Sequence, residues 1–119
     1  MDLRLAGKRA LVTGSSSGIG EAIAKLLAAE GVAVVVHGRD ESRANAVAEA
    51  IRAKGGEAEV ALGDLTTDAG ADAVAVAAQA FGPIDILVNN AGVIPRRSWT
   101  ETTATDWAQI YNSNVISGV

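Results

Sequence analysis

The sequence predicts an α/β protein built on a doubly wound parallel sheet, with helices on both faces in three layers. Four short runs of Val, Ile, Leu and Ala alternate with segments that repeat apolar residues at helical spacing. A glycine-rich segment follows the first apolar run, where a strand would turn into a helix. Strands separated by helices run parallel with right-handed crossovers. We therefore expect the strand order 3-2-1-4 and a ligand crevice between strands 1 and 4, where the order reverses.

The strands are predicted where apolar residues run continuously, as they do in a sheet that is buried on both faces. These segments are 9–13, 32–36, 57–62 and 84–88. A turn at Gly82 and Pro83 precedes the last of them.

The helices are predicted from apolar residues that recur three or four positions apart. The first helix starts near Ile19 and stops at Gly31, and the second stops at Gly55 and Gly56. The third is expected over 66–81, and a helical pattern resumes over 105–119 after an irregular segment, 91–103. The expected inward faces are Ala22, Ile23, Leu26 and Leu27 in the first helix, Ala44, Val47, Ala48 and Ile51 in the second, and Val74, Ala78 and Phe81 in the third.

Composition restricts the classes of protein that the chain can represent. Its 119 residues suffice for one domain, and 20% of them are charged, as in a soluble globular protein. A net charge of −4 gives no indication of nucleic-acid binding, and no apolar run is long enough to span a bilayer. The absence of cysteine excludes disulfides and a thiolate zinc site, and it fits a cytoplasmic protein. We expect no metal site.

The glycine-rich segment is the first candidate for chemistry. Glycines lack Cβ where the backbone turns sharply and where a pyrophosphate comes close, and the following helix start favours an anion. The preceding strand and the following helix supply the context that a dinucleotide-binding Rossmann motif requires. A glycine-rich turn without a ligand is the alternative. The predicted phosphate-binding residues are Gly14, Ser15, Ser16, Ser17, Gly18, Ile19 and Gly20.

The spacing G-x-x-x-G-x-G, together with Asn89-Asn90-Ala91-Gly92 after the fourth strand, resembles the short-chain dehydrogenase/reductase family. Asp64-Leu65 and Asn114 agree with that family's pattern, and the resemblance covers residues 8–119. It implies that Asp64 accepts a hydrogen bond from the adenine amino group and that Asn90 lies beside the adenosine ribose. It also implies that Asn114 belongs to the catalytic set and holds a water in a proton relay. The further cofactor contacts implied are Leu65, Ala91 and Gly92.

Each of these residues also has a structural interpretation. Asp64 is a candidate for a turn or helix start, and Asn114 for a buried amide bonded to nearby backbone. We assign Asn89 to backbone ties between strand ends, and His37 to a strand end without a catalytic role.

The end of the second strand bears on the choice of cofactor. An acidic residue there would bind the 2′-hydroxyl of NAD(H), but the sequence has Gly38 followed by Arg39. A guanidinium pairs well with a 2′-phosphate, so we expect NADP(H) to be preferred, with NAD(H) possible. The alternative makes Arg39 an exposed charge and Asp40 a helix N-cap. We regard Asp40 as a cap in either case.

The catalytic serine, tyrosine and lysine of the family are not evident in this sequence. The family places a serine on the next strand and a tyrosine with a lysine four residues later on the next helix, whereas Tyr111 is followed by Val115. We therefore expect residues 1–119 to be one Rossmann domain that ends inside a helix and is truncated relative to the family. The resemblance implies hydride transfer between NADP(H) and a ketone or secondary alcohol by a longer, homo-oligomeric protein. The alternative is an NAD(P)-binding module without catalysis, and the isolated chain is expected to be inactive.

Overall fold

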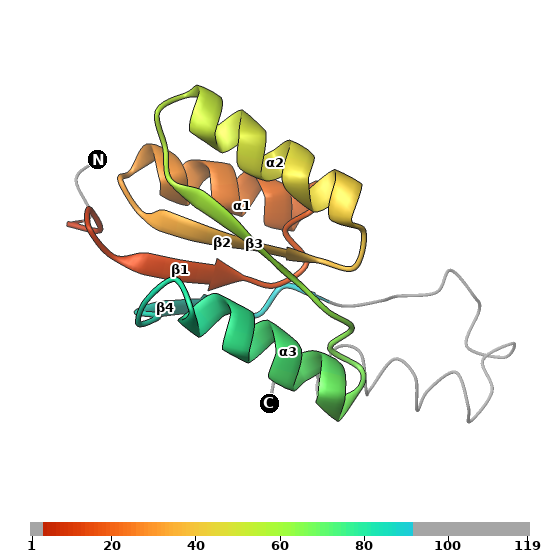
Figure 1. Ribbon diagram of the computed structural model, residues 1–119. Helices are drawn as coiled ribbons and strands as arrows, with labels where there is room; N and C mark the ends of the chain where they lie inside the picture. Colours follow the sequence, from red (N-terminus) through yellow and green to blue (C-terminus); the bar gives the residue numbers. More distant parts are fainter. Residues whose placement is uncertain (1–3, 92–119) are drawn as a thin grey trace, which may run out of the picture.

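The computed structural model describes residues 4–91, which form a parallel four-stranded sheet in the predicted order β3-β2-β1-β4 (Figure 1). Gly92, Asn114 and the helix expected from Thr105 lie outside the described residues. The elements are β1 (Arg9–Val12), α1 (Gly18–Ala29), β2 (Ala33–Gly38), α2 (Glu41–Ala53), β3 (Ala58–Leu62), α3 (Asp68–Gln79) and β4 (Ile86–Val88).

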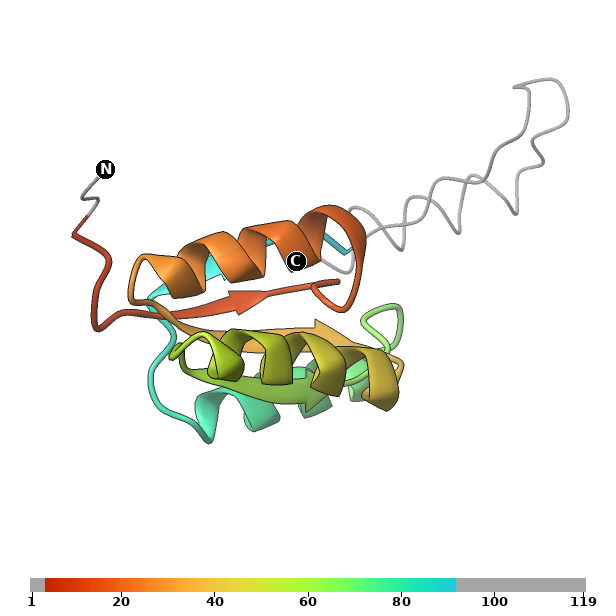
Figure 2. The same ribbon diagram turned by 90° about the horizontal axis from the view of Figure 1, so that it is seen from above.

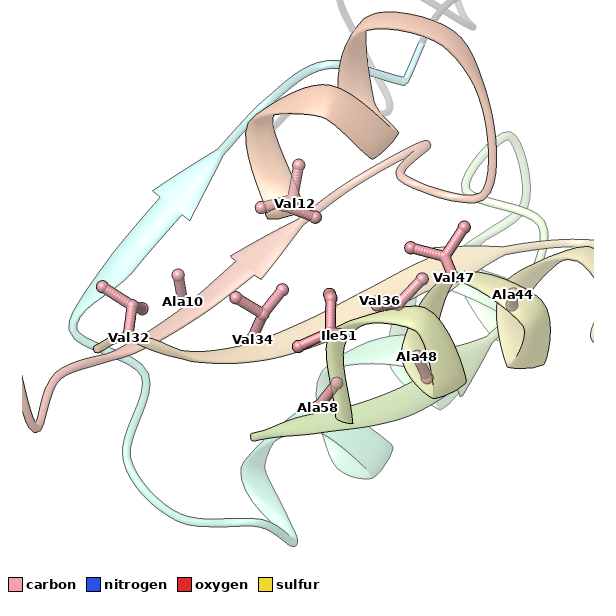
Figure 3. Packing of buried hydrophobic residues seen from close by; sticks show 11 residues of the cluster. Ala10, Val12, Val32, Val34, Val36, Ala44, Val47, Ala48, Ile51 and Ala58 are labelled. Atoms are coloured by element: carbon pink, nitrogen blue, oxygen red, sulfur yellow. The ribbon is translucent and has the colours of Figure 1, made fainter. Parts of the chain in front are cut away.

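The predicted layers are present: α1 and α2 cover one face of the sheet, and α3 covers the other (Figures 1 and 2). A hydrophobic core lies on each face of the sheet. Side chains of successive strand residues point to opposite faces, so the residues of β2 enter the two cores alternately. Val34 and Val36 pack into the α1/α2 side, as Figure 3 shows, and Val35 packs with Val74 of α3 on the other side. A central strand buried on both faces explains why its sequence is continuously apolar.

Helix α2 faces the core with the four residues that its periodicity predicts, whereas the prediction for α1 was partly wrong. Ala22 and Leu26 of α1 are exposed, and the buried residues are Gly20 and Ala24. Helix α1 has apolar residues on more than one face, so periodicity alone does not identify the inward one. Small residues lie on that face because the helix packs closely against the sheet.

Several element boundaries also differ from the prediction, and β2 extends over Ala33–Gly38 rather than 32–36. Helix α3 begins at Asp68 rather than residue 66, because the side chain of Thr67 caps it by accepting from the backbone N–H of Gly70 at 3.0 Å. It ends before Phe81, which is partly exposed. Strand β4 begins at Ile86 rather than residue 84. Asp85 precedes it and bonds to the backbone of Arg9 through both its N–H and its carboxylate.

Within residues 4–91, no helix combines the length and the apolarity that crossing a membrane requires.

Candidate cofactor-binding site

A cleft of about 420 Å³ lies at the carboxyl ends of the strands, where the reversal of strand order predicts a ligand crevice. Its volume lies in the usual range for small-molecule sites. Most of the described residues predicted to bind cofactor line it. These are Gly14, Ser16, Ser17, Ile19, Arg39, Asp64, Leu65, Asn90 and Ala91. The other lining residues are His37, Gly38, Gly63 and Thr66.

Thr13 holds the two sides of the cleft together at the ends of β1 and β4. Its Oγ1 accepts from the backbone N–H groups of Asn90 at 2.9 Å and Ala91 at 3.0 Å, and donates to the carbonyl of Val88 at 3.2 Å. This brings Ala91 against Gly14, where a Cβ would lie 3.0 Å from the Ala91 Cα. Gly14 also has φ +65°, a left-handed conformation that favours glycine. We expected Asn89 to connect the strand ends through backbone hydrogen bonds, but the backbone N–H groups of Asn90 and Ala91 form these bonds.

Ser15, Gly18 and Gly20, which were predicted to contact phosphate, do not line the cleft. Ser15 is fully buried, and its Oγ donates to the carbonyl of Val12 at 2.7 Å. A Cβ on Gly20 would collide with the Gly14 carbonyl oxygen, so this glycine allows α1 to pack close to the loop. Gly18 has φ +59°. The backbone of these residues therefore shapes the loop whose other members reach the cleft.

The first turn of α1 differs from that of the other two helices. Asp40 caps α2 by accepting from the Arg43 N–H at 3.2 Å, and Thr67 caps α3, but Ser17 makes no capping hydrogen bond at the start of α1. The first N–H groups of a helix need an acceptor, and the helix dipole makes that end attractive to an anion. Ser17 and Ile19 of this turn line the cleft. The loop and α1 therefore fit a dinucleotide pyrophosphate.

The end of β2 supplies a positive charge beside a crowded glycine. A Cβ on Gly38 would lie 2.7 Å from Ser16 Oγ and 2.8 Å from Ser16 Cβ, so no larger residue fits there without movement. Arg39 is exposed and lines the cleft. Within residues 4–91 none of the ion pairs includes Arg39, and the neighbouring Asp40 pairs with Arg43 at 3.7 Å. The interpretation of Asp40 as an N-cap is confirmed.

Asp64 lines the cleft beyond the end of β3, and its carboxylate is locally bonded. Oδ1 accepts from Thr66 Oγ1 at 2.6 Å and from the Thr66 N–H at 2.9 Å. These hydrogen bonds, with smaller contributions from Arg39 and His37, lower the pKa of Asp64 from its ordinary value. The carboxylate is therefore charged at neutral pH. The expected turn role of Asp64 is present in the structure, and the adenine contact remains a prediction.

His37 is the cleft residue whose importance sequence reasoning underestimated. It was assigned to a strand end, which is correct, but its ring also contacts two loops of the cleft. The signal lay in the topology, because parallel neighbouring strands bring the end of β2 beside both the glycine loop and the end of β3. Within residues 4–91, no group of three side chains is placed to hold a metal ion.

The fold and the cleft have the arrangement that is typical of dinucleotide-binding proteins. The family model for short chain dehydrogenase matches residues 8–119, and the chain belongs to this family of oxidoreductases. Gluconate 5-dehydrogenase of Gluconobacter oxydans is 43% identical over 112 residues, which cover 93% of this chain and 44% of that protein.

Solved structures of relatives have the same fold. L-Sorbose reductase from Gluconobacter frateurii, complexed with NADPH and L-sorbose, superimposes with a TM-score of 0.92 at 37% identity, over 99% of this chain and 46% of its own. A 7α-hydroxysteroid dehydrogenase complexed with NADH and a 7-oxo bile acid superimposes with a TM-score of 0.90 at 38% identity, over 98% of this chain and 46% of its own. The chain thus spans less than half the length of these relatives.

Proposed function

We propose that these residues form the cofactor-binding part of an enzyme that transfers a hydride between NADP(H) and a ketone or secondary alcohol. The observation that carries the choice of NADP(H) is the pair Gly38 and Arg39 at the cleft. A carboxylate side chain at position 38 would crowd Ser16, and Arg39 offers a cation suited to a 2′-phosphate.

The remaining cleft residues are assigned to the other parts of the cofactor. The glycine loop and the uncapped first turn of α1 would hold the pyrophosphate. Asp64 would accept from the adenine amino group, and Asn90 would lie beside the adenosine ribose. The bound nicotinamide supplies the hydride chemistry, and this chain's residues bind and orient the cofactor.

The relatives support the cofactor class without deciding between its two forms. L-Sorbose reductase is complexed with NADPH, whereas the 7α-hydroxysteroid dehydrogenase is complexed with NADH. Both act on compounds that contain a carbonyl or a hydroxyl group. We therefore infer the preference of this protein from its own residues at the end of β2.

Calorimetric titration with NADPH and NADH tests the proposal. We expect tighter binding of NADPH, and we expect Arg39→Ala to weaken NADPH binding by about tenfold or more while leaving NADH nearly unchanged. Arg43→Ala is the matched control, because it removes an equal charge nearby that does not line the cleft. Equal affinities for both cofactors, unchanged in Arg39→Ala, would remove the case for NADP(H).

A cofactor-binding module without catalysis is the second candidate. Its support is that the 119 residues contain no tyrosine followed four residues later by lysine. Asn114 is the one residue of this chain proposed for the catalytic set. We expect the isolated 119-residue chain to bind NADPH but not to oxidise it in the presence of a ketone panel, as absorbance of the reduced nicotinamide would report.

We also propose a cytoplasmic homo-oligomer, on the family resemblance. The segment proposed for pairing is the helix expected from Thr105. Light scattering of the purified protein at working concentration would give its mass, and a monomer would argue against this assembly.

A further inference from the structure

His37 lines the cleft, and both nitrogens of its ring have partners. The residue is 4% exposed. Nδ1 accepts a hydrogen bond from the backbone N–H of Gly14 at 2.8 Å, and Nε2 lies 2.9 Å from the carbonyl oxygen of Gly63. Gly14 belongs to the glycine loop after β1, and Gly63 directly precedes Asp64 after β3. One imidazole therefore connects two loops that are far apart in the sequence.

These partners fix the protonation state of the ring. A backbone N–H can only donate and a carbonyl oxygen can only accept, so Nδ1 must be bare and Nε2 must carry the proton. The ring is then a neutral imidazole in a single tautomer. A second proton on Nδ1 would point at the Gly14 N–H, placing donor against donor.

The backbone of His37 strengthens the connection on the glycine-loop side. Its N–H donates to Ser15 Oγ at 2.9 Å, and its carbonyl accepts from the Ser15 N–H at 2.9 Å. The ring contact with Gly63 has no such support from Ser15. The Gly63 N–H also donates to the Gly38 carbonyl at 3.3 Å, and the ring adds a direct side-chain link between the Asp64 loop and the glycine loop.

We propose that His37, in its neutral form, is a positioning residue that sets the spacing between the glycine loop and the Asp64 loop and thereby the affinity for the adenosine part of NADP(H). The proposal rests on the proposed function, in which the first loop holds the pyrophosphate and Asp64 meets the adenine. His37 acts through Gly14 and Gly63, which is why replacing it changes cofactor affinity.

The charges near the ring favour the neutral form on balance. Burial lowers the pKa of His37 from its ordinary value of 6.5, the Gly63 carbonyl acts in the opposite direction, and the Arg39 charge lowers the pKa further. The Asp64 carboxylate has a smaller raising effect. Among residues 4–91, Arg39 after β2 and Asp64 after β3 are the charged groups that act on the ring. Acidification below this lowered pKa should therefore protonate Nδ1 and separate the loops.

Two substitutions separate the two ring contacts of His37, one with Gly14 and one with Gly63. In His37→Asn the amide oxygen occupies the position of Nδ1 and keeps the Gly14 contact, while the Gly63 contact is lost. In His37→Gln the amide nitrogen reaches the position of Nε2 and keeps the Gly63 contact, while the acceptor for Gly14 is lost. His37→Leu removes both.

The experiment titrates each folded variant with NADPH and with 2′,5′-ADP over a pH series, after thermal melting has established that it folds. We expect His37→Asn and His37→Gln each to lose about three- to tenfold in affinity at neutral pH, and His37→Leu to lose more. The 2′-phosphate itself titrates near pH 6, so wild type is compared with His37→Asn at each pH. Wild type should lose more affinity on acidification than the asparagine variant does.

A second measurement does not depend on the cofactor. Nitrogen NMR of the ligand-free protein should show His37 as the neutral Nε2–H tautomer at neutral pH. A charged ring, the Nδ1–H tautomer, or variants that bind both probes as wild type does would overturn the role of His37 alone. Failure of wild type to bind NADPH at every pH would overturn the proposed function and this inference with it, even if the tautomer is as expected.

Discussion

Strands β2 and β4 were both predicted from apolar runs in the sequence, yet they have different surroundings in the fold. Strand β2 pairs with β1 and β3, and its residues from Val34 to Gly38 are all buried. Strand β4 pairs with β1 on one side, and none of its three residues is buried. Leu87 at its centre is 56% exposed, whereas Val36 of β2 is fully buried. Within residues 4–91, the other edge of β4 is not paired.

The difference shows that an apolar run predicts a strand but not how much of it is covered. Coverage depends on elements that are distant in the sequence: β2 receives α1 and α2 on one face and α3 on the other. The same contrast applies to the cleft. The part of the cleft from the glycine loop to Asp64 lies among the described residues, while Gly92 and Asn114 lie outside them.

The largest expected effect tests the two strands with the same substitution. Val36→Asp would bury an unpaired carboxylate in the core and should lower the free energy of unfolding by more than about 4 kcal/mol. Leu87→Asp should cost about 1 kcal/mol or less, because the side chain is already largely in water. Urea unfolding followed by circular dichroism measures both.

The informative result would be a large fall in the free energy of unfolding of Leu87→Asp. It would mean that Leu87 is covered in solution, either by other parts of the protein or by a second copy. The contrast between β2 and β4 would then belong to residues 4–91 alone, and not to the whole protein.

A medium effect is expected at the carboxyl ends of the same strands. Gly38→Asp crowds Ser16 and places a carboxylate near the proposed 2′-phosphate, so NADPH affinity should fall by about tenfold or more. Asn89→Asp adds the same charge at the end of β4, where the residue is exposed and does not line the cleft. It should change NADPH affinity by about twofold or less. Calorimetry with both cofactors checks the pair.

The double variant Ser16→Gly/Gly38→Asp separates crowding from charge. Removing the Ser16 side chain gives the new carboxylate space, so we expect recovered stability and a preference shifted toward NADH. If Gly38→Asp alone already binds NADH better than wild type, Ser16 does not restrict position 38, and that part of the cofactor argument is wrong.

Much of the fold followed from local patterns. Continuous apolar runs identified the strands. The spacing of Ala44, Val47, Ala48 and Ile51 identified the inward face of α2, because the large apolar residues of that helix, Val47 and Ile51, both lie on it. The glycine spacing identified the loop of the cleft, since the left-handed conformations of Gly14 and Gly18 favour glycine. Arg39, Asp64 and Asn90 were located by their order after the strands.

The remainder depends on contacts that local patterns do not contain. Leu26 is exposed although it fits an apolar helical face, because Gly20 and Ala24 make the close contact with the sheet. Ser15 turns inward because the backbone of His37 needs its hydroxyl. The bridging role of His37 follows from the pairing of β2 with both β1 and β3, and no single segment of sequence specifies it.

The smallest expected effect compares helix starts on the two sides of the sheet. Thr67 accepts from the Gly70 N–H at 3.0 Å, so Thr67→Ala should lower the free energy of unfolding by about 1 kcal/mol. Ser17 makes no such bond at the start of α1, so Ser17→Ala should cost less than about 0.5 kcal/mol. Both variants are compared with wild type by urea unfolding, with and without NADPH. If an anion satisfies the first turn of α1, NADPH should still stabilise both variants. A cost at Ser17 that matches the cost at Thr67, in the absence of cofactor, would mean that Ser17 caps α1 in solution. The uncapped turn would then cease to support a phosphate site.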